Sequence, residues 1–177
     1  MCLHLFGDAA LDPDMHLRVI DAIRLAAAPS VRFRGAHASN LCQTVEDIIA
    51  TTPDLPDPLT IDLITPLRLL HGGRPVRTFD PSLFISSLFR RLSSLAAWYG
   101  DHPIDADFPE LSRLCRMVGM TGSTLRWARW SEKVQGITGS VSLTGVSREL
   151  MPFLLAGEYT NAGKGGAWGF GRFRVNR

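Results

Sequence analysis

The chain has 177 residues, of which 45% are apolar and 20% charged, so it can bury the core of one ordinary domain and is not disordered throughout. Its net charge of +2 is too small to predict a nucleic-acid partner by itself. The three cysteines are far apart, with no CxxC pair, which argues against a disulfide framework and a structural zinc site. No segment resembles a membrane span or a signal peptide, so a cytoplasmic protein is expected.

Residues 1–55 carry one helical pattern, in which Leu17, Ile20 and Ile23 recur at helical spacing before Pro29 ends the run. This stretch is too short to be a stable domain alone. Three prolines within residues 51–58 then indicate a linker. We therefore predict a partial N-terminal segment, residues 1–55, and one complete domain, residues 56–177.

The complete domain opens with a strand. Residues 59–65 alternate between apolar and polar side chains, and Pro66 marks the end of regular pairing. A turn follows at residues 71–75. Asp80 and Pro81 form a helix start, with the aspartate as N-cap, and the apolar stripe continues to Tyr99. A second, shorter helix is predicted over residues 108–120.

The second half of the domain reads as a hairpin, a helix and a last strand. Residues 124–134 and 136–144 form the hairpin, and a helix is expected over residues 148–156. Residues 170–175 alternate as a closing strand. The order is β, α, an inserted α, β, β, α, β, which predicts an α+β fold of the ferredoxin-like, or RRM-like, βαββαβ type.

The segment before the last strand is rich in glycine. Five glycines lie between Gly163 and Gly171, Lys164 stands among them, and Arg172 and Arg174 follow. A loop that bares backbone amides beside fixed cations suits a phosphate backbone. The alternative is a tight connection between helix and strand that packs on the sheet. Trp168 either stacks on a base or is buried beneath the loop.

Other arginines are grouped along the chain. Arginine binds phosphate through two parallel hydrogen bonds, although a GC-rich genome also produces an arginine bias. Arg90 and Arg91 are expected on the solvated face of their helix. The predicted RNA-binding residues are Gly163, Lys164, Gly165, Gly166, Arg172 and Arg174 of the tail, together with Arg68, Arg74, Arg77 and Arg126.

Several motifs, taken in order, resemble a known family. They are Ile61-Asp62-Leu63-Ile64-Thr65-Pro66-Leu67-Arg68, Phe89-Arg90-Arg91-Leu92, Gly136-Ile137-Thr138-Gly139, Leu154-x-x-Gly157-Glu158 and the glycine loop itself. Over residues 59–177 the sequence is similar to the C-terminal half of the CRISPR-associated repeat endoribonucleases of the RAMP superfamily. Members of that family usually have two tandem ferredoxin-like domains, and the first fifty residues resemble the end of the preceding domain.

The resemblance implies binding of CRISPR repeat RNA and cleavage of the precursor without a metal or other cofactor, through attack of a 2′-hydroxyl that leaves a cyclic phosphate. His37 and His71 are the candidate bases, each also readable as a solvated loop residue. Asn161 replaces a histidine that often precedes the Gly-Lys-Gly. The alternatives are a non-catalytic subunit that holds the crRNA 3′ end or stem-loop beside other Cas proteins, and an isolated half without activity.

Overall fold

The computed structural model describes residues 14–15, 17–19, 21–22, 56–99, 103–129, 131–132 and 134–176. The chain divides into two compact units, Met1–Thr44 and Val45–Arg177. In the first unit, the described residues are helical. The remainder of that unit, including His37, lies outside the described residues. All strands below belong to the second unit.

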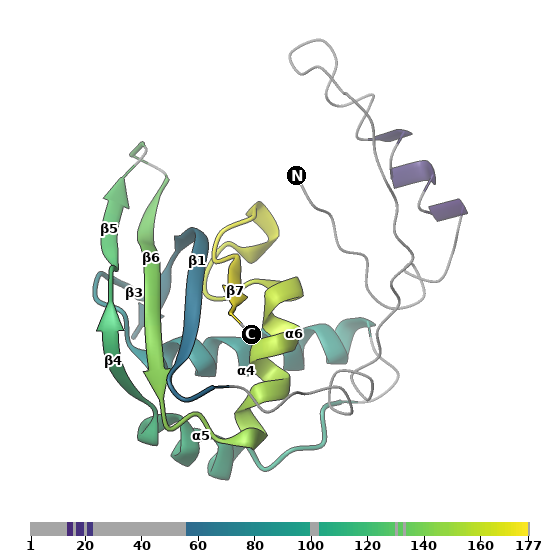
Figure 1. The fold of residues 1–177 in the computed structure, drawn as a ribbon. Coiled ribbons are helices and arrows are strands. Elements are labelled where there is room, and N and C mark those ends of the chain that lie inside the picture. The colour runs from purple at the N-terminus through teal and green to yellow at the C-terminus, as the bar shows by residue number, and fades with distance from the viewer. Residues whose placement is uncertain are drawn as a thin grey trace. The chain divides into compact units, whose positions relative to one another are not determined.

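The second unit is built on a five-stranded antiparallel sheet (Figure 1). Its order is β4-β6-β1-β7, and β5 also pairs with β6 beyond the end of β4. A separate two-stranded hairpin, β2 with β3, follows β1. The strands are β1 (Leu59–Leu67), β2 (Leu69–His71), β3 (Arg74–Val76), β4 (Gly119–Ser123), β5 (Arg126–Arg129), β6 (Gln135–Thr144) and β7 (Phe173–Val175).

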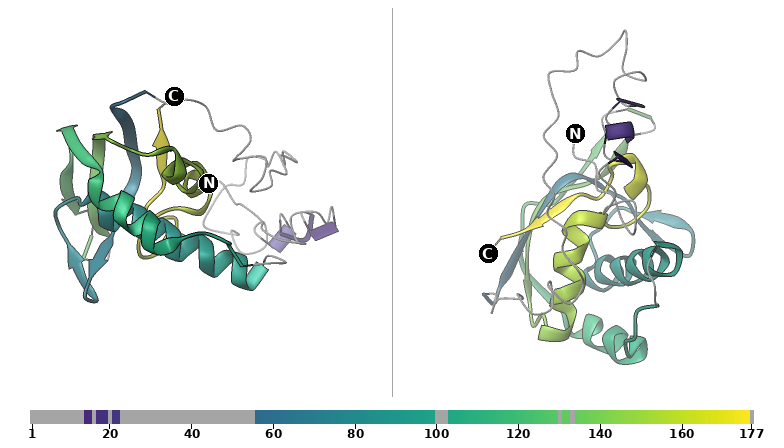
Figure 2. Two further views of the ribbon diagram at one scale, coloured as in Figure 1. Left: turned by 90° about the horizontal axis from the view of Figure 1, so that it is seen from below. Right: turned by 90° about the vertical axis from the view of Figure 1, so that its right-hand side faces the viewer.

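Helices α4 (Pro81–Tyr99) and α6 (Met151–Thr160) cover one face of this sheet (Figures 1 and 2). α5 (Phe108–Met117) packs beside α4. The predicted start of α4 is confirmed, since the Asp80 carboxylate accepts a hydrogen bond of 3.0 Å from the Leu83 backbone amide. None of the helices in the described segments has the length and hydrophobicity needed to cross a lipid bilayer.

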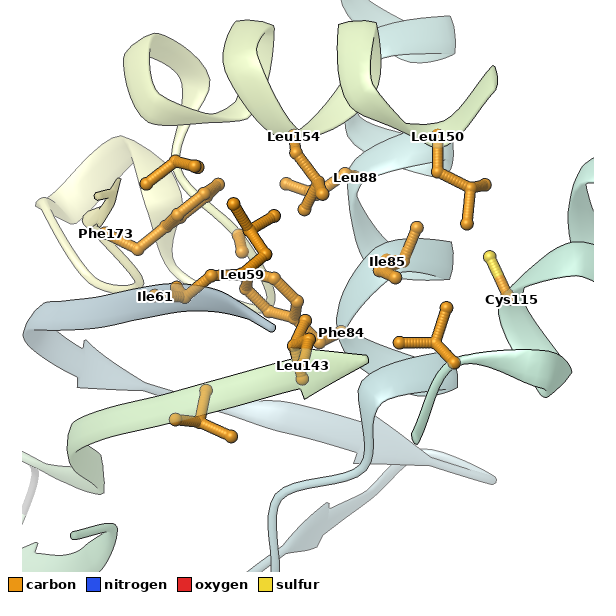
Figure 3. Close-up of a cluster of buried hydrophobic side chains, with 14 of the residues drawn as sticks. Leu59, Ile61, Phe84, Ile85, Leu88, Cys115, Leu143, Leu150, Leu154 and Phe173 are labelled. Atoms are coloured by element: carbon orange, nitrogen blue, oxygen red, sulfur yellow. The ribbon is translucent and has the colours of Figure 1, made fainter. Parts of the chain in front are cut away.

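The core lies between the sheet and these two helices (Figure 3). Ile61 on β1, Phe84 on α4 and Leu154 on α6 are fully buried. The Phe84 ring meets the Phe173 ring of β7 edge-on, with centroids 5.0 Å apart. Burial raises the pKa of the Cys115 thiol to about 11, so this residue is a neutral part of the core.

The Leu154-x-x-Gly157-Glu158 motif has a packing role. A Cβ added at Gly157 would come within 2.8 Å of the side-chain ends of both Leu88 and Phe173, so a larger residue would have to displace these buried side chains. One turn of α6 thus brings Leu154 and Gly157 to the core. The carboxylate of the next residue, Glu158, accepts a hydrogen bond of 2.8 Å from the Val175 backbone amide. This bond joins α6 to the edge strand β7.

The predicted strand over residues 124–134 was wrong in its extent. Among the described residues of that range, only Arg126–Arg129 form a strand, β5. The strand before it, β4, occupies Gly119–Ser123, because the helix predicted over 108–120 ends at Met117, and both strands pair with β6. Gly119 lies opposite Thr144, and a Cβ there would meet the Thr144 side-chain hydroxyl at 2.8 Å. Pairing of Gly119 with β6 therefore begins a strand inside the stretch predicted to be helical. The last strand also starts late, at Phe173, because the residues before it form the loop described next.

Candidate nucleic-acid interface

The glycine loop, residues 161–172, connects α6 to β7 and closes over the end of β1, where Figure 1 shows it in yellow. The Lys164 amide donates to the Arg68 carbonyl at 2.8 Å, and the Gly171 amide donates to the Pro66 carbonyl at 3.0 Å. The ends of the loop are also joined, since the Ala162 amide donates to the Gly171 carbonyl at 2.9 Å. The loop is therefore hydrogen-bonded to the sheet and to itself.

Two glycines make this closure possible. Gly163 and Gly171 both have φ of +70°, a conformation that side chains rarely adopt. A Cβ at Gly163 would approach the Arg68 carbonyl oxygen to 2.5 Å, and one at Gly171 would overlap the Ala162 carbonyl oxygen. Glycine is needed here both for the backbone angle and for the close contact.

The prediction that the loop bares its amides holds for only part of it. A short 3₁₀ turn, Gly166–Trp168, uses the amides of the residues that follow it, and the Gly163 amide donates to the Ser87 hydroxyl at 3.1 Å. Within the described residues, the amides of Gly165, Gly166 and Ala167 have no acceptor. Gly166 is buried, so the amides of the half-buried Gly165 and the exposed Ala167 are the donors left for a ligand.

Lys164 and Trp168 are exposed side chains of this loop. Trp168 is 86% exposed, which excludes burial beneath the loop. Phe170 is half-buried, with the Arg68 guanidinium over its ring at 5.6 Å from the centroid. The loop thus presents one ammonium group, one guanidinium group and one open indole ring.

Arg91 is a loop contact that sequence reasoning missed. It is half-buried, and its Nε donates to the Thr160 carbonyl at 3.2 Å, beside Gly166. Arg90 is exposed, as expected for a solvated helix face. Ser87 and Arg91 are one turn apart on α4, and both bind the backbone of the loop segment. The sequence signal for this contact is the spacing of Ser87 and Arg91, two polar residues four positions apart beside the apolar stripe of α4.

Asn161 ends α6 and belongs to the loop's own hydrogen bonds. Its φ is +64°, which asparagine tolerates better than most residues. Its side-chain amide donates to the Gly166 carbonyl at 3.0 Å. The side chain that replaces the family's frequent histidine is therefore engaged in holding the turn.

Arg172 and Arg174 alternate with the buried Phe173, so both lie on the sheet face that α4 and α6 leave uncovered. Arg174 is directly opposite Asp62 on β1. The Asp62 carboxylate accepts hydrogen bonds from the Ser140 hydroxyl at 2.5 Å and from the Asn176 amide at 3.1 Å. These two bonds and the nearby Arg174 charge lower the pKa of Asp62, against a smaller opposing effect of burial.

Removing the Ser140 hydroxyl should raise the pKa of Asp62. The pKa of Asp62 is lower in the folded than in the unfolded chain, so its stabilising contribution is complete above the unfolded pKa of about 3.9 and disappears as the pH falls through the folded pKa. Ser140→Ala should therefore cost more stability at pH 7 than at pH 3. Carboxyl NMR titration and urea unfolding measure the two effects. Ser142→Ala, which loses only a bond to Thr60, should leave the Asp62 pKa unchanged.

The remaining predicted residues lie on other elements. His71 and Arg74 face each other across the β2–β3 hairpin, both exposed. Arg77 follows that hairpin, and its guanidinium lies 5.7 Å from the centroid of the Trp127 ring on β5. Arg126 and Arg129 point to opposite faces of β5, so they do not line one surface. Among the described residues, no three His, Cys, Asp or Glu side chains are grouped to hold a metal ion.

The sheet, the two covering helices and the loop define a ferredoxin-like domain with a C-terminal glycine-rich loop, the architecture that was predicted. A family model described as "CRISPR-associated endoribonuclease Cas6" matches residues 61–173. The match covers more than half of the chain, so this chain belongs to the Cas6 family.

Solved structures agree with this assignment at the level of the fold. "Cas6 (TTHA0078) substrate mimic complex" superimposes with a TM-score of 0.60 at 20% identity, over 76% of this chain and 58% of that one. Thermus thermophilus Cas6 (TTHB231) gives a TM-score of 0.62 at 17% identity, over 76% and 58%. Its product complex gives 0.68 at 18% identity, over 94% of this chain and 72% of that one. The chain thus spans 58% of the first of these relatives. No curated protein matches it.

Proposed function

We propose that this chain binds CRISPR repeat RNA through the glycine loop and takes part in cutting the precursor RNA within its repeats. The observation that carries the proposal is the loop itself, a turn hydrogen-bonded to β1 that presents Lys164, Trp168 and the unused amides of Gly165 and Ala167. Family membership supports it, and two related structures are titled as complexes with a substrate mimic and with product.

The proposed contacts divide by role. Lys164, Arg68 and Arg172 bind phosphate oxygens, and the amides of Gly165 and Ala167 add neutral donors, whereas Gly166 is buried and shapes the turn. Gly163 acts by allowing the approach of the loop to β1 rather than as a donor, because its amide is bonded to Ser87. The arginines on the other elements, Arg74, Arg77, Arg126 and Arg174, extend the positive surface.

The proposed reaction needs no metal ion. A base takes the proton from a ribose 2′-hydroxyl, the resulting oxygen attacks the adjacent phosphorus, and the bond to the 5′ oxygen breaks. The products are a 2′,3′-cyclic phosphate and a 5′-hydroxyl that has gained a proton. His71, beside Arg74, and His37, in the part of the chain outside the described residues, are the candidate bases.

A second candidate function is binding without cleavage. Asn161 cannot act as a base at neutral pH, and its side chain is engaged with Gly166. The chain would then hold the crRNA 3′ end or stem-loop beside other Cas proteins. One similar chain is titled "Cas6-RT-Cas1--Cas2 complex", at 14% identity and a TM-score of 0.61.

Incubation of the chain with repeat RNA from its own genome in EDTA separates the two candidates. A cyclic-phosphate product that His71→Ala or His37→Ala abolishes would support the enzyme. His102→Ala, a histidine with no expected role, is the matched control. Tight binding that leaves the RNA intact would support the binding subunit, and absence of any binding would contradict both.

Trp168 should contribute to affinity by stacking on a base. Trp168→Ala should weaken binding about tenfold, whereas Trp168→Phe should retain most of the affinity because it keeps an aromatic face. Trp98 is 82% exposed on α4 and is the matched control, so Trp98→Ala should bind like the original chain. Fluorescence anisotropy with labelled repeat RNA measures all three. Equal effects of the two alanine substitutions would contradict a specific role of Trp168.

A further inference from the structure

A pocket of about 190 Å³ opens between the segment that follows β3 and strands β4 and β5. Phe79 and Ile137, both buried, contribute apolar surface, and Trp127 contributes an aromatic one. Pockets for drug-sized ligands measure about 300–1,000 Å³, so this one suits a single ring system. Its lining residues are Arg77, Thr78, Phe79, Met120, Ser123, Leu125, Arg126, Trp127 and Ile137.

The chemistry of the lining favours a nucleotide. Arg77 and Arg126 are exposed cations, and none of the residues lining the pocket is acidic. The Arg77 guanidinium lies over the Trp127 ring, which places positive charge next to aromatic surface. Unpaired RNA bases bind to aromatic and guanidinium planes while the attached phosphate needs a cation. The pocket supplies both within one site.

The pocket and the loop lie at neighbouring strands of the sheet. Ile137 on β6 pairs with Trp127 of β5 on one side and with Leu67 of β1 on the other. The next residue after Leu67 is Arg68, whose carbonyl accepts a hydrogen bond from the backbone amide of Lys164 in the glycine loop. Strands lie about 4.8 Å apart, so β5 and β1 are separated by roughly 10 Å here. A short single-stranded segment spans that distance.

We propose that this pocket receives one unpaired base of the same RNA whose backbone the glycine loop holds, an inference that rests on the proposed function. Base and phosphate are recognised separately, the ring by Trp127, Phe79 and Arg77 and the phosphate by Arg126. A paired base inside a helix is stacked on its neighbours and does not enter the pocket. The RNA bound by this chain therefore has an unpaired nucleotide next to the segment on the loop.

Two substitutions test the pocket directly. Ser123→Phe starts from an exposed position at the end of β4 and fills the pocket, and Arg126→Ala removes one cation from it. Arg129→Ala is the matched control, an exposed arginine on the same strand that does not line the pocket. With fluorescein-labelled repeat RNA, Ser123→Phe should weaken binding about tenfold, the loss of one stacked base, and Arg129→Ala should leave it unchanged.

Repeat RNAs with one abasic residue, moved along the sequence, identify the base. One position should reproduce the loss caused by Ser123→Phe, and the substitution should add no further loss with that RNA. Additive losses at every position would overturn the pocket assignment. The same holds if Ser123→Phe and Arg126→Ala bind normally while Lys164→Ala weakens binding, an outcome that leaves the proposed function intact. If no variant and no original chain binds repeat RNA, both proposals fail.

Discussion

Lys164→Ala should weaken the binding of repeat RNA about tenfold, and the slope of log affinity against log salt should become shallower by about one phosphate contact. The Lys164 side chain is exposed, while its amide is fixed to the Arg68 carbonyl at 2.8 Å, so the ammonium group is carried on an anchored backbone. Titrations at several salt concentrations measure both quantities.

Arg113→Ala is the control for net charge. Arg113 is an exposed cation on α5 that forms an ion pair with Glu110, with the closest atoms 2.6 Å apart. Its removal changes the charge of the chain as much as the loss of Lys164 does. If both variants lost affinity equally, the contribution of Lys164 would be one of general charge, and a specific phosphate contact at the loop would be contradicted.

Gly171→Ala should be among the most destabilising single substitutions in this domain. The new Cβ would overlap the Ala162 carbonyl oxygen, at a residue whose φ is +70°. The hydrogen bonds from Ala162 to Gly171 and from Gly171 to Pro66 would have to break for the clash to be relieved. We expect a loss of about 4 kcal/mol or more in the free energy of unfolding, measured in urea.

Gly169→Ala separates backbone strain from the clash. Gly169 has φ of +82°, but a Cβ there would meet nothing within 4 Å. It should cost only about 1–2 kcal/mol, the penalty for a left-handed residue. Similar losses for the two variants would show that the loop relaxes away from Ala162. The contacts described between the loop ends would then contribute little to stability.

Local patterns were sufficient for some of the regular elements. Alternation predicted β1, and Asp80 followed by Pro81 predicted the start of α4, because each signal depends on neighbours within one turn or one strand. The start of β4 at Gly119, inside the stretch predicted as helix, was not visible locally. It depends on pairing with β6, in which Gly119 lies opposite Thr144, a residue of another strand.

The sequence predicted which residue types make up the candidate site, but not how their side chains and backbone groups are placed. Glycines around a lysine indicated a loop that approaches phosphate, and Lys164 is exposed there. The spacing of Ser87 and Arg91 marked them as polar residues beside an apolar stripe, but the partner of Arg91 was not predictable, because the Thr160 carbonyl is 69 positions further along the chain. Nor did any pattern distinguish Trp168, which is open to solvent, from Phe170, which is half-buried under Arg68.

By itself, then, the order of residues determined the ferredoxin-like sequence of strands and helices and the glycine loop before the last strand, since propensity and periodicity act over short distances. Tertiary structure alone decided which loop amides stay free, which aromatic ring faces solvent, and that a pocket forms beside Arg77 and Arg126. These features depend on hydrogen bonds and packing between segments far apart in the chain, such as Arg68 with Lys164 and Leu67 with Ile137. Such contacts form only when the chain folds and brings these distant segments together.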